Sequence, residues 1–187
     1  MPLLLPHNET KILLHTCCAP CSCSIIDLLL ENSLTPLLFF YNPNIHPQEE
    51  YAKRKSELLR YARKRGVSFV DADYDVDAWF QEVQGLEEEL ERGKRCTVCF
   101  EMRLAKAAEY ASQNCFRVLS STLGISRWKN LDQITAAGKK AVVPFPDLIY
   151  FDYNWRKGDA QKRAKEISTQ ENFYRQSYCG CVFSKRG

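Results

Sequence analysis

The sequence predicts an α/β fold in which one parallel sheet carries helices on both faces. Short apolar runs alternate with longer amphipathic segments along most of the chain, as they do in successive strand–helix–strand units. The chain has 187 residues, of which 45% are hydrophobic, so it is long enough to bury a sizeable core. We therefore expect a single α/β domain over residues 1–187 that ends in a helical, cysteine-bearing tail from about residue 155 to residue 187.

The first elements form a strand–helix–strand unit. The apolar run "KILLH" (11–15) predicts a buried strand. The helix that follows, 20–31, begins on Pro20, whose missing N–H costs nothing at the first helical position. The run "TPLLFFYNP" (35–43) predicts the second strand.

A second unit follows the same order. The charged segment 47–66 has helical spacing and ends on Gly66, a residue common just after a helix. The run "VSFVDAD" (67–73) predicts the third strand. Two short helical pieces are expected between residues 77 and 92.

The second half continues the alternation. A helix is expected over 97–113, a strand over "FRVLSSTL" (116–123) and a helix over 128–140. The run "AVVPF" (141–145) predicts a short fifth strand, and a helical pattern over 156–168 opens the tail.

Composition limits the class of protein. The formal net charge of +3 permits an anionic partner without requiring one. No apolar run approaches the roughly 18 residues of a membrane span, and the leucines near the N-terminus lack the basic flank of a signal peptide. We therefore expect a cytoplasmic protein with no membrane partner. Thiols stay reduced there, so clustered cysteines bind metals or do redox chemistry more often than they form disulfides.

Seven of the nine cysteines fall into three short motifs. They are Cys17, Cys18 and Cys21; Cys96 and Cys99; and Cys179 and Cys181. The first motif follows the strand at 11–15, and open parallel sheets bind ligands beyond the carboxyl ends of their strands. The turn there has no glycine, whereas phosphate-binding turns use glycine to expose backbone N–H groups. The sequence therefore predicts a cysteine-rich metal site at the C-terminal ends of the strands.

Seven thiols exceed the needs of one metal site, since a tetrahedral zinc ion or a [4Fe–4S] cluster takes four ligands. The three extra thiols indicate either a second metal beside the first or a redox-active dithiol. Spacing alone leaves structural zinc and an iron–sulfur cluster both open. Two features favour iron–sulfur: a full α/β core does not need zinc to fold, and adjacent cysteines at a strand end occupy a ligand-binding location.

Three other residues each have two interpretations. Cys23 and Cys115 lie in apolar contexts, which favours burial in the core over a ligand role. His15, at the end of the first strand, is either a metal ligand or proton donor or a hydrogen-bonded strand residue. With Cys17 and Cys18, it completes the set of candidate catalytic residues.

The helix at 47–66 is strongly basic. Helical spacing places Lys53, Arg60 and Lys64 on one face. Pairs with glutamates four residues earlier explain part of this pattern as a solvated, salt-bridged surface. A phosphate-binding rim for a nucleic acid is the other interpretation. The candidate RNA-binding residues are Lys53, Arg54, Arg60, Lys64 and Arg156.

Five segments spread over the chain carry a family resemblance. They are "HTCCAPCS", "YNPNIHPQEEYAKRK", "RCTVCFEMRL", "SSTLGISRWKN" and "ENFYRQSYCGCVFS". Together they resemble the QueH-type epoxyqueuosine reductases, over essentially the whole chain from Ile12 to Ser184. The three cysteine motifs in this order make the resemblance specific.

The resemblance implies a fold, a reaction and cofactors. The fold would be similar to that of adenine-nucleotide α-hydrolase-like (HUP/PP-loop-like) proteins, with the phosphate loop replaced by cysteines. The reaction would be the last step of queuosine formation, the reductive removal of the epoxide oxygen of epoxyqueuosine at the wobble position of a tRNA anticodon, without cobalamin. The seven cysteines of the three motifs would hold a [4Fe–4S] cluster and a further mononuclear iron.

The implied reaction suits these residues. Conversion of an epoxide to an alkene with loss of water takes two electrons and two protons, so an external electron donor is needed. A cluster relays electrons singly, and an iron with an open coordination position polarises the epoxide oxygen. His15, Tyr178 and nearby aspartates are candidates for the proton donor. Tyr153 and Trp155 lie in a segment suited to stacking on anticodon bases, with core packing as the alternative for Trp155.

Two other classes of protein remain open. An iron–sulfur tRNA sulfur-transfer enzyme of related fold would need ATP, for which the glycine-free first turn is unsuited. A zinc-stabilised nucleic-acid-binding module would hold zinc and catalyse no reaction.

Overall fold

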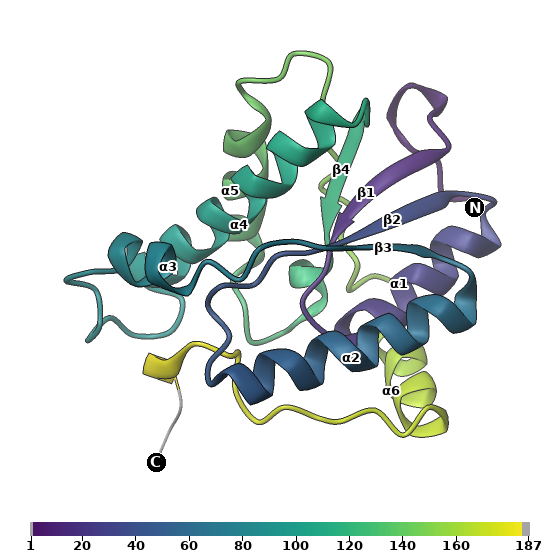
Figure 1. Cartoon of the computed structure of the whole chain (residues 1–187). Coiled ribbons are helices and arrows are strands. Elements are labelled where there is room, and N and C mark those ends of the chain that lie inside the picture. Colours follow the sequence, from purple (N-terminus) through teal and green to yellow (C-terminus); the bar gives the residue numbers. More distant parts are fainter. Residues whose placement is uncertain (1, 185–187) are drawn as a thin grey trace.

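Five parallel strands form one sheet in the computed structural model, which describes residues 2–184 (Figure 1). The order across the sheet is β3-β2-β1-β4-β5, and every neighbouring pair is parallel. The strands are β1 (Lys11–His15), β2 (Thr35–Phe40), β3 (Ser68–Asp71), β4 (Val118–Ser121) and β5 (Ile149–Tyr150). The strand order reverses between β1 and β4, and such a reversal is where open sheets of this kind bind ligands.

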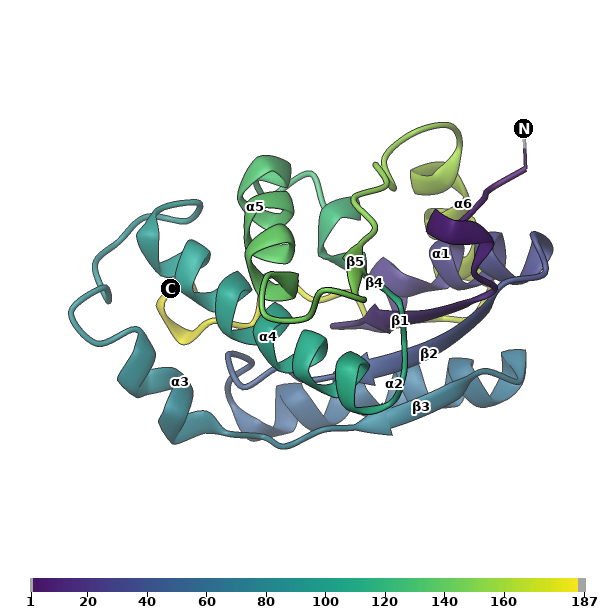
Figure 2. The same ribbon diagram turned by 90° about the horizontal axis from the view of Figure 1, so that it is seen from above.

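Helices cover both faces of the sheet, which confirms the predicted α/β class. Figures 1 and 2 show α1, α2 and α6 on one face and α4 and α5 on the other. The α-helices are α1 (Ala19–Glu31), α2 (Gln48–Arg65), α3 (Val76–Glu82), α4 (Lys94–Gln113), α5 (Leu131–Val142) and α6 (Ala160–Gln170). Short 3-10 helices lie at η1 (Pro6–Asn8), η2 (Thr122–Ile125) and η3 (Val182–Ser184).

The apolar run of β1 is continuous because both of its faces are covered. Ile12 and Leu14 pack into the core beneath α1 and α2, and Leu13 packs into the core beneath α4 and α5. All three side chains are fully buried. Alternate residues of a strand point to opposite faces, so a strand buried on both sides has no polar positions to alternate with.

The predicted fifth strand at 141–145 is wrong. Ala141 and Val142 complete α5 instead, and β5 is the two-residue segment Ile149–Tyr150. The buried residues Ile134, Ala137 and Ala141 recur at helical spacing, so the apolar run continues the inner face of the helix.

The segment expected to hold two short helices, 77–92, contains a single helix. That helix is α3, which ends at Glu82, and turns follow up to Gly93. The segment after Glu82 is rich in glutamate and exposed. It therefore lacks the apolar stripe that would dock a second helix against the core.

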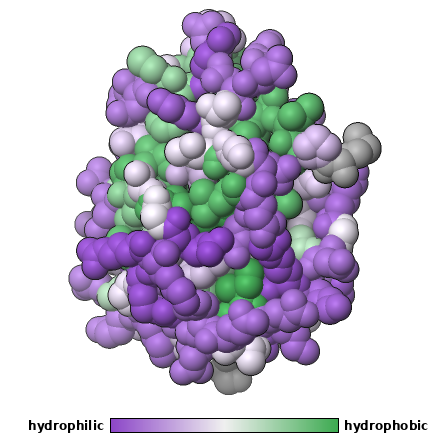
Figure 3. All heavy atoms as spheres, turned by 90° about the vertical axis from the view of Figure 1, so that its right-hand side faces the viewer, coloured by the Kyte–Doolittle hydropathy of each residue, from purple (hydrophilic) through white to green (hydrophobic). Residues whose placement is uncertain are grey.

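The tail crosses the surface of α2 back toward the C-terminal ends of the strands. Glu171 contacts the end of α2 through Arg60 and Lys64, while Tyr178 lies beside the start of that helix (Figure 1). The expected tail extends to residue 187, and residues 185–187 lie outside the described part. No helix among residues 2–184 combines the length and apolar character needed to cross a membrane. Figure 3 shows the side of the molecule that is on the right in Figure 1. Its surface is mostly hydrophilic, and its hydrophobic side chains lie mainly in the upper half of the view.

Candidate metal centre

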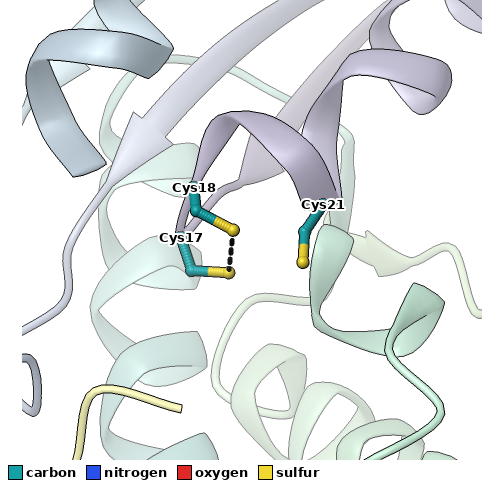
Figure 4. Close-up of side chains that lie close together, drawn as sticks. All are labelled: Cys17, Cys18 and Cys21. Carbon is teal, nitrogen blue, oxygen red and sulfur yellow. Dashed lines mark hydrogen bonds between the residues drawn. The ribbon is translucent and has the colours of Figure 1, made fainter. Parts of the chain in front are cut away.

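Cys17, Cys18 and Cys21 lie where β1 gives way to α1. Their three sulfur atoms are within 4.8 Å of one another, and the Sγ atoms of Cys17 and Cys18 are 3.8 Å apart (Figure 4). Cys18 has an extended backbone just before α1, and Pro20 occupies the first turn of that helix. The turn therefore directs all three side chains toward one point. Across residues 2–184, no other three histidine, cysteine or acidic side chains come this close together.

The other two cysteine motifs come to the same end of the sheet. Cys96 and Cys99 occupy the first turns of α4, and Cys96 packs against the same core cluster as Cys17 and Cys18. Gln176, on the tail, donates its Nε2–H to Cys18 Sγ over 3.0 Å. The structure thus brings all three sequence motifs to the C-terminal side of the strands, in accord with the sequence analysis.

A buried arginine fixes the third motif, Cys179 and Cys181. Arg54 on α2 is 2% exposed and donates to the carbonyl oxygens of Cys179 (3.0 Å) and Tyr178 (3.1 Å). Its guanidinium also pairs with Glu50 at 2.7 Å. Gly180 has φ +110°, and a Cβ there would lie 2.8 Å from a side-chain carbon of Ile45. Only glycine fits between the two cysteines without strain.

A second buried arginine links α4 to the end of β1. Arg103 donates to Cys99 Sγ (3.8 Å) and to Asn42 Oδ1 (2.5 Å), and Asn42 donates in turn to the carbonyl oxygen of Thr16 (3.0 Å). Thr16 directly precedes Cys17. The relative position of the first and second cysteine motifs is therefore held by a continuous hydrogen-bonded chain.

The thiols do not share one charge state. Donation from the thiols of Cys18 and Cys21 holds the pKa of Cys17 well below its usual value, and the same contacts raise the pKa of both donors. Donation from Cys181 likewise lowers the pKa of Cys179. Each of these two motifs therefore contains one favoured thiolate. The remaining thiols must lose protons when they bind a metal.

A third cation, Lys129, lies within electrostatic range of the same sulfurs. Burial works against its charge, yet its pKa is raised because the negative charge at Cys17 and Cys179 favours the ammonium form. Lys129 follows Trp128 in the loop after η2. It therefore contributes positive charge to the site from the β4 side.

The donor set fits a thiolate-bound, anionic group. Arg103 is 2% exposed and forms no ion pair with a carboxylate anywhere in residues 2–184, so the sulfurs are its counter-charge. The buried Nε of Arg103 and Nε1 of Trp79 also have no hydrogen-bond partner. Trp79 packs against Cys179 and Cys181. Unpaired N–H donors beside thiolates suit the sulfide and thiolate acceptors of an iron–sulfur group.

His15 is not placed to donate a proton. Its ring is fully buried, with Nε2 3.2 Å from the carbonyl oxygen of Tyr41 and Nδ1 3.0 Å from Ser121 Oγ. A carbonyl only accepts, so Nε2 carries the hydrogen and Nδ1 accepts from the serine. Burial, aided by the charge of Arg103, lowers the pKa of His15 to about 3. The structure favours the hydrogen-bonded alternative, in which His15 joins the ends of β1, β2 and β4.

Two of the five candidate RNA-binding residues are already engaged. Arg54 is buried under the tail, which contradicts its expected role on an RNA-binding face. Arg156 is half-buried and donates to the carbonyl oxygens of Gly124, Ser126 and Lys129. Both guanidiniums satisfy backbone acceptors that local sequence spacing cannot reveal.

The three remaining candidates are exposed on α2, as expected. Arg60 and Lys64 nevertheless pair with Glu171 on the tail, and Lys53 lies over the ring of Tyr174, 3.5 Å from its centroid. This face therefore holds the tail against α2.

The prediction that Cys23 and Cys115 are both buried in the core holds for only one of them. Cys23 is fully buried, as predicted. Cys115 is exposed, so the predicted burial is wrong. It follows the end of α4 with φ +57°, in a turn that directs the chain away from the helix. Trp155 is 2% exposed and belongs to the core, which contradicts a stacking role.

The sequence analysis missed Arg103, Lys129 and Gln176. A signal existed for Arg103, which stands four residues after Cys99 and so shares its face of α4. Lys129 and Gln176 lie in irregular segments, where no periodicity reports which way a side chain points.

Comparisons with known proteins point to one family. The family model described as "Epoxyqueuosine reductase QueH" matches residues 12–187. Curated relatives of that name from Acinetobacter baylyi and Histophilus somni are 53% and 52% identical over 98% of this chain, covering 84% and 76% of their own lengths. One from Thermotoga maritima is 34% identical over 92% of this chain and 89% of its own.

A solved structure shares the fold at much lower identity. It is the U34-tRNA thiolase NcsA from Methanococcus maripaludis with its [4Fe–4S] cluster, with a TM-score of 0.59 and 10% identity over 95% of this chain. This chain spans 62% of the thiolase's length. At that identity, the likeness supports the fold.

Proposed function

This chain belongs to the family of epoxyqueuosine reductases QueH, and we propose that it catalyses the reaction for which that family is named. It would remove the epoxide oxygen of epoxyqueuosine at the wobble position of a tRNA anticodon and leave queuosine. The observation that carries the proposal is the compact triad of Cys17, Cys18 and Cys21 at the strand-order reversal, together with the buried Arg103, which forms no ion pair with a carboxylate among residues 2–184.

The cofactors of this proposal are a [4Fe–4S] cluster and one further iron, without cobalamin. Their ligands would be drawn from the seven cysteines of the three motifs. When bound, the cluster supplies electrons one at a time, and the iron polarises the epoxide oxygen. Support comes from the number of thiols, the convergence of Cys17, Cys18 and Cys21, and the unpaired N–H donors of Arg103 and Trp79.

The chain's own residues balance charge and protons in this proposal. Arg103 and Lys129 offset the negative charge of the thiolates from two sides. The reaction consumes two protons with its two electrons and releases the oxygen as water. Lys129, whose pKa the thiolates raise, holds a proton at Nζ, whereas His15 is locked in its neutral form and the hydroxyl of Tyr178 donates to the carbonyl oxygen of His46.

The partners follow from the chemistry. The substrate is a tRNA, so its anticodon loop must reach the C-terminal ends of the strands. The two electrons come from an external donor, because the chemistry leaves the protein unchanged after each turnover. We place this reaction in the cytoplasm, where tRNA and reduced thiols occur together.

The test combines metal analysis with turnover. Protein prepared without oxygen should contain more than four iron atoms per chain and inorganic sulfide. With dithionite and tRNA that carries epoxyqueuosine, it should yield a nucleoside lighter by one oxygen atom, as measured by mass spectrometry of digested tRNA. Cys18→Ala is the matched negative control. Stoichiometric zinc without sulfide, or no conversion by fully loaded protein, would contradict the proposal.

A further inference from the structure

Trp128 is an aromatic side chain left in solvent beside the cysteine site. It is 80% exposed, whereas Trp79 and Trp155 are 0% and 2% exposed. It stands in the loop that leaves the C-terminal end of β4 after η2. Tryptophan is enriched in binding surfaces, because its large ring gains more free energy from burial than smaller side chains do.

The loop backbone is fixed while the ring is free. Arg92 donates through Nε to the carbonyl oxygen of Trp128 and through Nη2 to that of Arg127, both over 3.1 Å. Arg156 anchors the other side through the carbonyl oxygen of Lys129 at 2.8 Å. The ring is therefore presented from an ordered backbone, which lowers the entropy cost of binding a partner.

The same contacts place Trp128 on the rim of the sulfur site. The backbone N–H of Arg92 donates to Cys96 Sγ over 3.2 Å, so one residue joins the tryptophan loop to a cysteine of the second motif. On the other side, Lys129 is next in sequence and lies within electrostatic range of the cysteines of the first and third motifs. Trp128 therefore lies between Arg92, which contacts Cys96, and Lys129.

The surroundings of the ring favour an anionic, aromatic partner. Arg127, its neighbour in sequence, and Arg92, which donates to its carbonyl oxygen, are both exposed. Neither Arg92 nor Arg127 pairs with a carboxylate among residues 2–184. Base stacking on an aromatic ring next to an arginine that contacts phosphate is the usual mode of single-stranded RNA binding. An acidic protein could also bind to exposed arginines, but it has no flat nucleobase to stack on the tryptophan ring. RNA therefore fits this surface better than an acidic protein does.

We propose that Trp128 stacks on an unpaired anticodon-loop base and that Arg127 contacts the neighbouring phosphate. The inference rests on the proposed function, because it assumes that a tRNA brings its wobble nucleotide to the cysteines. A nucleotide that leaves the loop stack exposes its neighbours, and Trp128 offers the replacement surface at the rim. This assignment puts the RNA contact on the β4 loop, away from the α2 face that the tail occupies.

The test measures binding of an anticodon stem-loop that carries epoxyqueuosine to the metal-loaded protein. Trp128→Ala should weaken binding about 5-fold to about 140-fold, from roughly 1–3 kcal/mol per stacked base. Trp128→Phe should keep most of the affinity. The quenching of tryptophan fluorescence by RNA should be lost in both. Val143→Ala, which alters an apolar side chain that is 78% exposed at the other end of α5, is the control.

Salt dependence tests the phosphate contact. Arg127→Ala should reduce the log–log salt slope of binding by about 0.7–0.9, whereas Arg63→Ala, an exposed arginine near the far end of α2, should leave it unchanged.

The two hypotheses fail in different ways. Equal RNA affinity and equal quenching for wild type and Trp128→Ala would overturn the inference and leave this surface to a protein partner. Wild-type turnover would still support the proposed function. Stacking by a wild type that binds the RNA but never converts it would support the inference and overturn the function.

Discussion

Arg54→Ala should release the tail that carries Cys179 and Cys181. Arg54 is 2% exposed and joins α2 to the tail through two backbone carbonyls, in addition to its pair with Glu50. In the variant, the two carbonyl oxygens lose their donor. The carboxylate of Glu50, which is 10% exposed, loses its cation. Removal of one member of a buried ion pair costs about 3–5 kcal/mol. Glu50 keeps a 3.0 Å bond from the hydroxyl of Tyr174, which favours the lower end of that range.

A loss of about 3 kcal/mol corresponds to roughly a 140-fold change in an equilibrium, at 1.4 kcal/mol per factor of ten. If the lost free energy is local, the tail opens more often by about that factor. Alkylation of Cys179 and Cys181, followed by mass spectrometry on metal-free protein, should then accelerate up to about 100-fold, with the rate at Cys99 unchanged. If the tail unfolds with the rest of the protein, urea unfolding should show the loss instead.

Two comparisons make this prediction decisive. Arg63→Ala removes an exposed arginine from the same helix and should change stability by no more than about 0.5 kcal/mol. Arg54→Lys keeps the charge but not the planar fork, so it should recover only part of the loss. Wild-type alkylation rates together with a stability loss below about 1 kcal/mol in Arg54→Ala would show that Arg54 does not hold the tail. Such a result, joined to weakened RNA binding, would return Arg54 to the RNA-contact role that the sequence indicated.

Three further outcomes are expected. Cys99→Ala should lose metal absorbance and turnover while Cys23→Ala keeps both, and the opposite pattern in metal analysis would contradict the grouping of the thiols. Gly180→Ala should lower the unfolding midpoint and the metal content, because the new Cβ meets Ile45 at 2.8 Å; Gly85→Ala, which has a similar positive φ but no neighbour within 4 Å, isolates the cost of φ alone. Reversal of the exposed basic face of α2 should speed Cys179 alkylation, because new carboxylates would face Glu171, and RNA titrations of the same variant test the predicted phosphate contacts. That variant combines Lys53→Glu, Arg60→Glu and Lys64→Glu.

The fold class and the cysteine site could be predicted from the sequence, because both depend on local patterns. A buried parallel strand such as β1 is a short apolar run, and it remains one wherever the chain places it. The first cysteine motif follows that strand directly, and the carboxyl ends of parallel strands share one edge of a sheet. The candidate ligand groups were therefore visible before any tertiary contact was known.

Which basic and aromatic side chains are buried and which stay exposed depends on the tertiary structure. Lys53 and Arg54 are neighbours on one helix, yet only Arg54 is buried, because a tail about 125 residues away in sequence folds over it. Trp155 is covered by the core and Trp128 is not, although each lies in an irregular segment. Helical or strand periodicity reports a side chain's direction relative to its own element. Whether another part of the chain covers that direction depends on contacts between distant residues, which no local pattern contains.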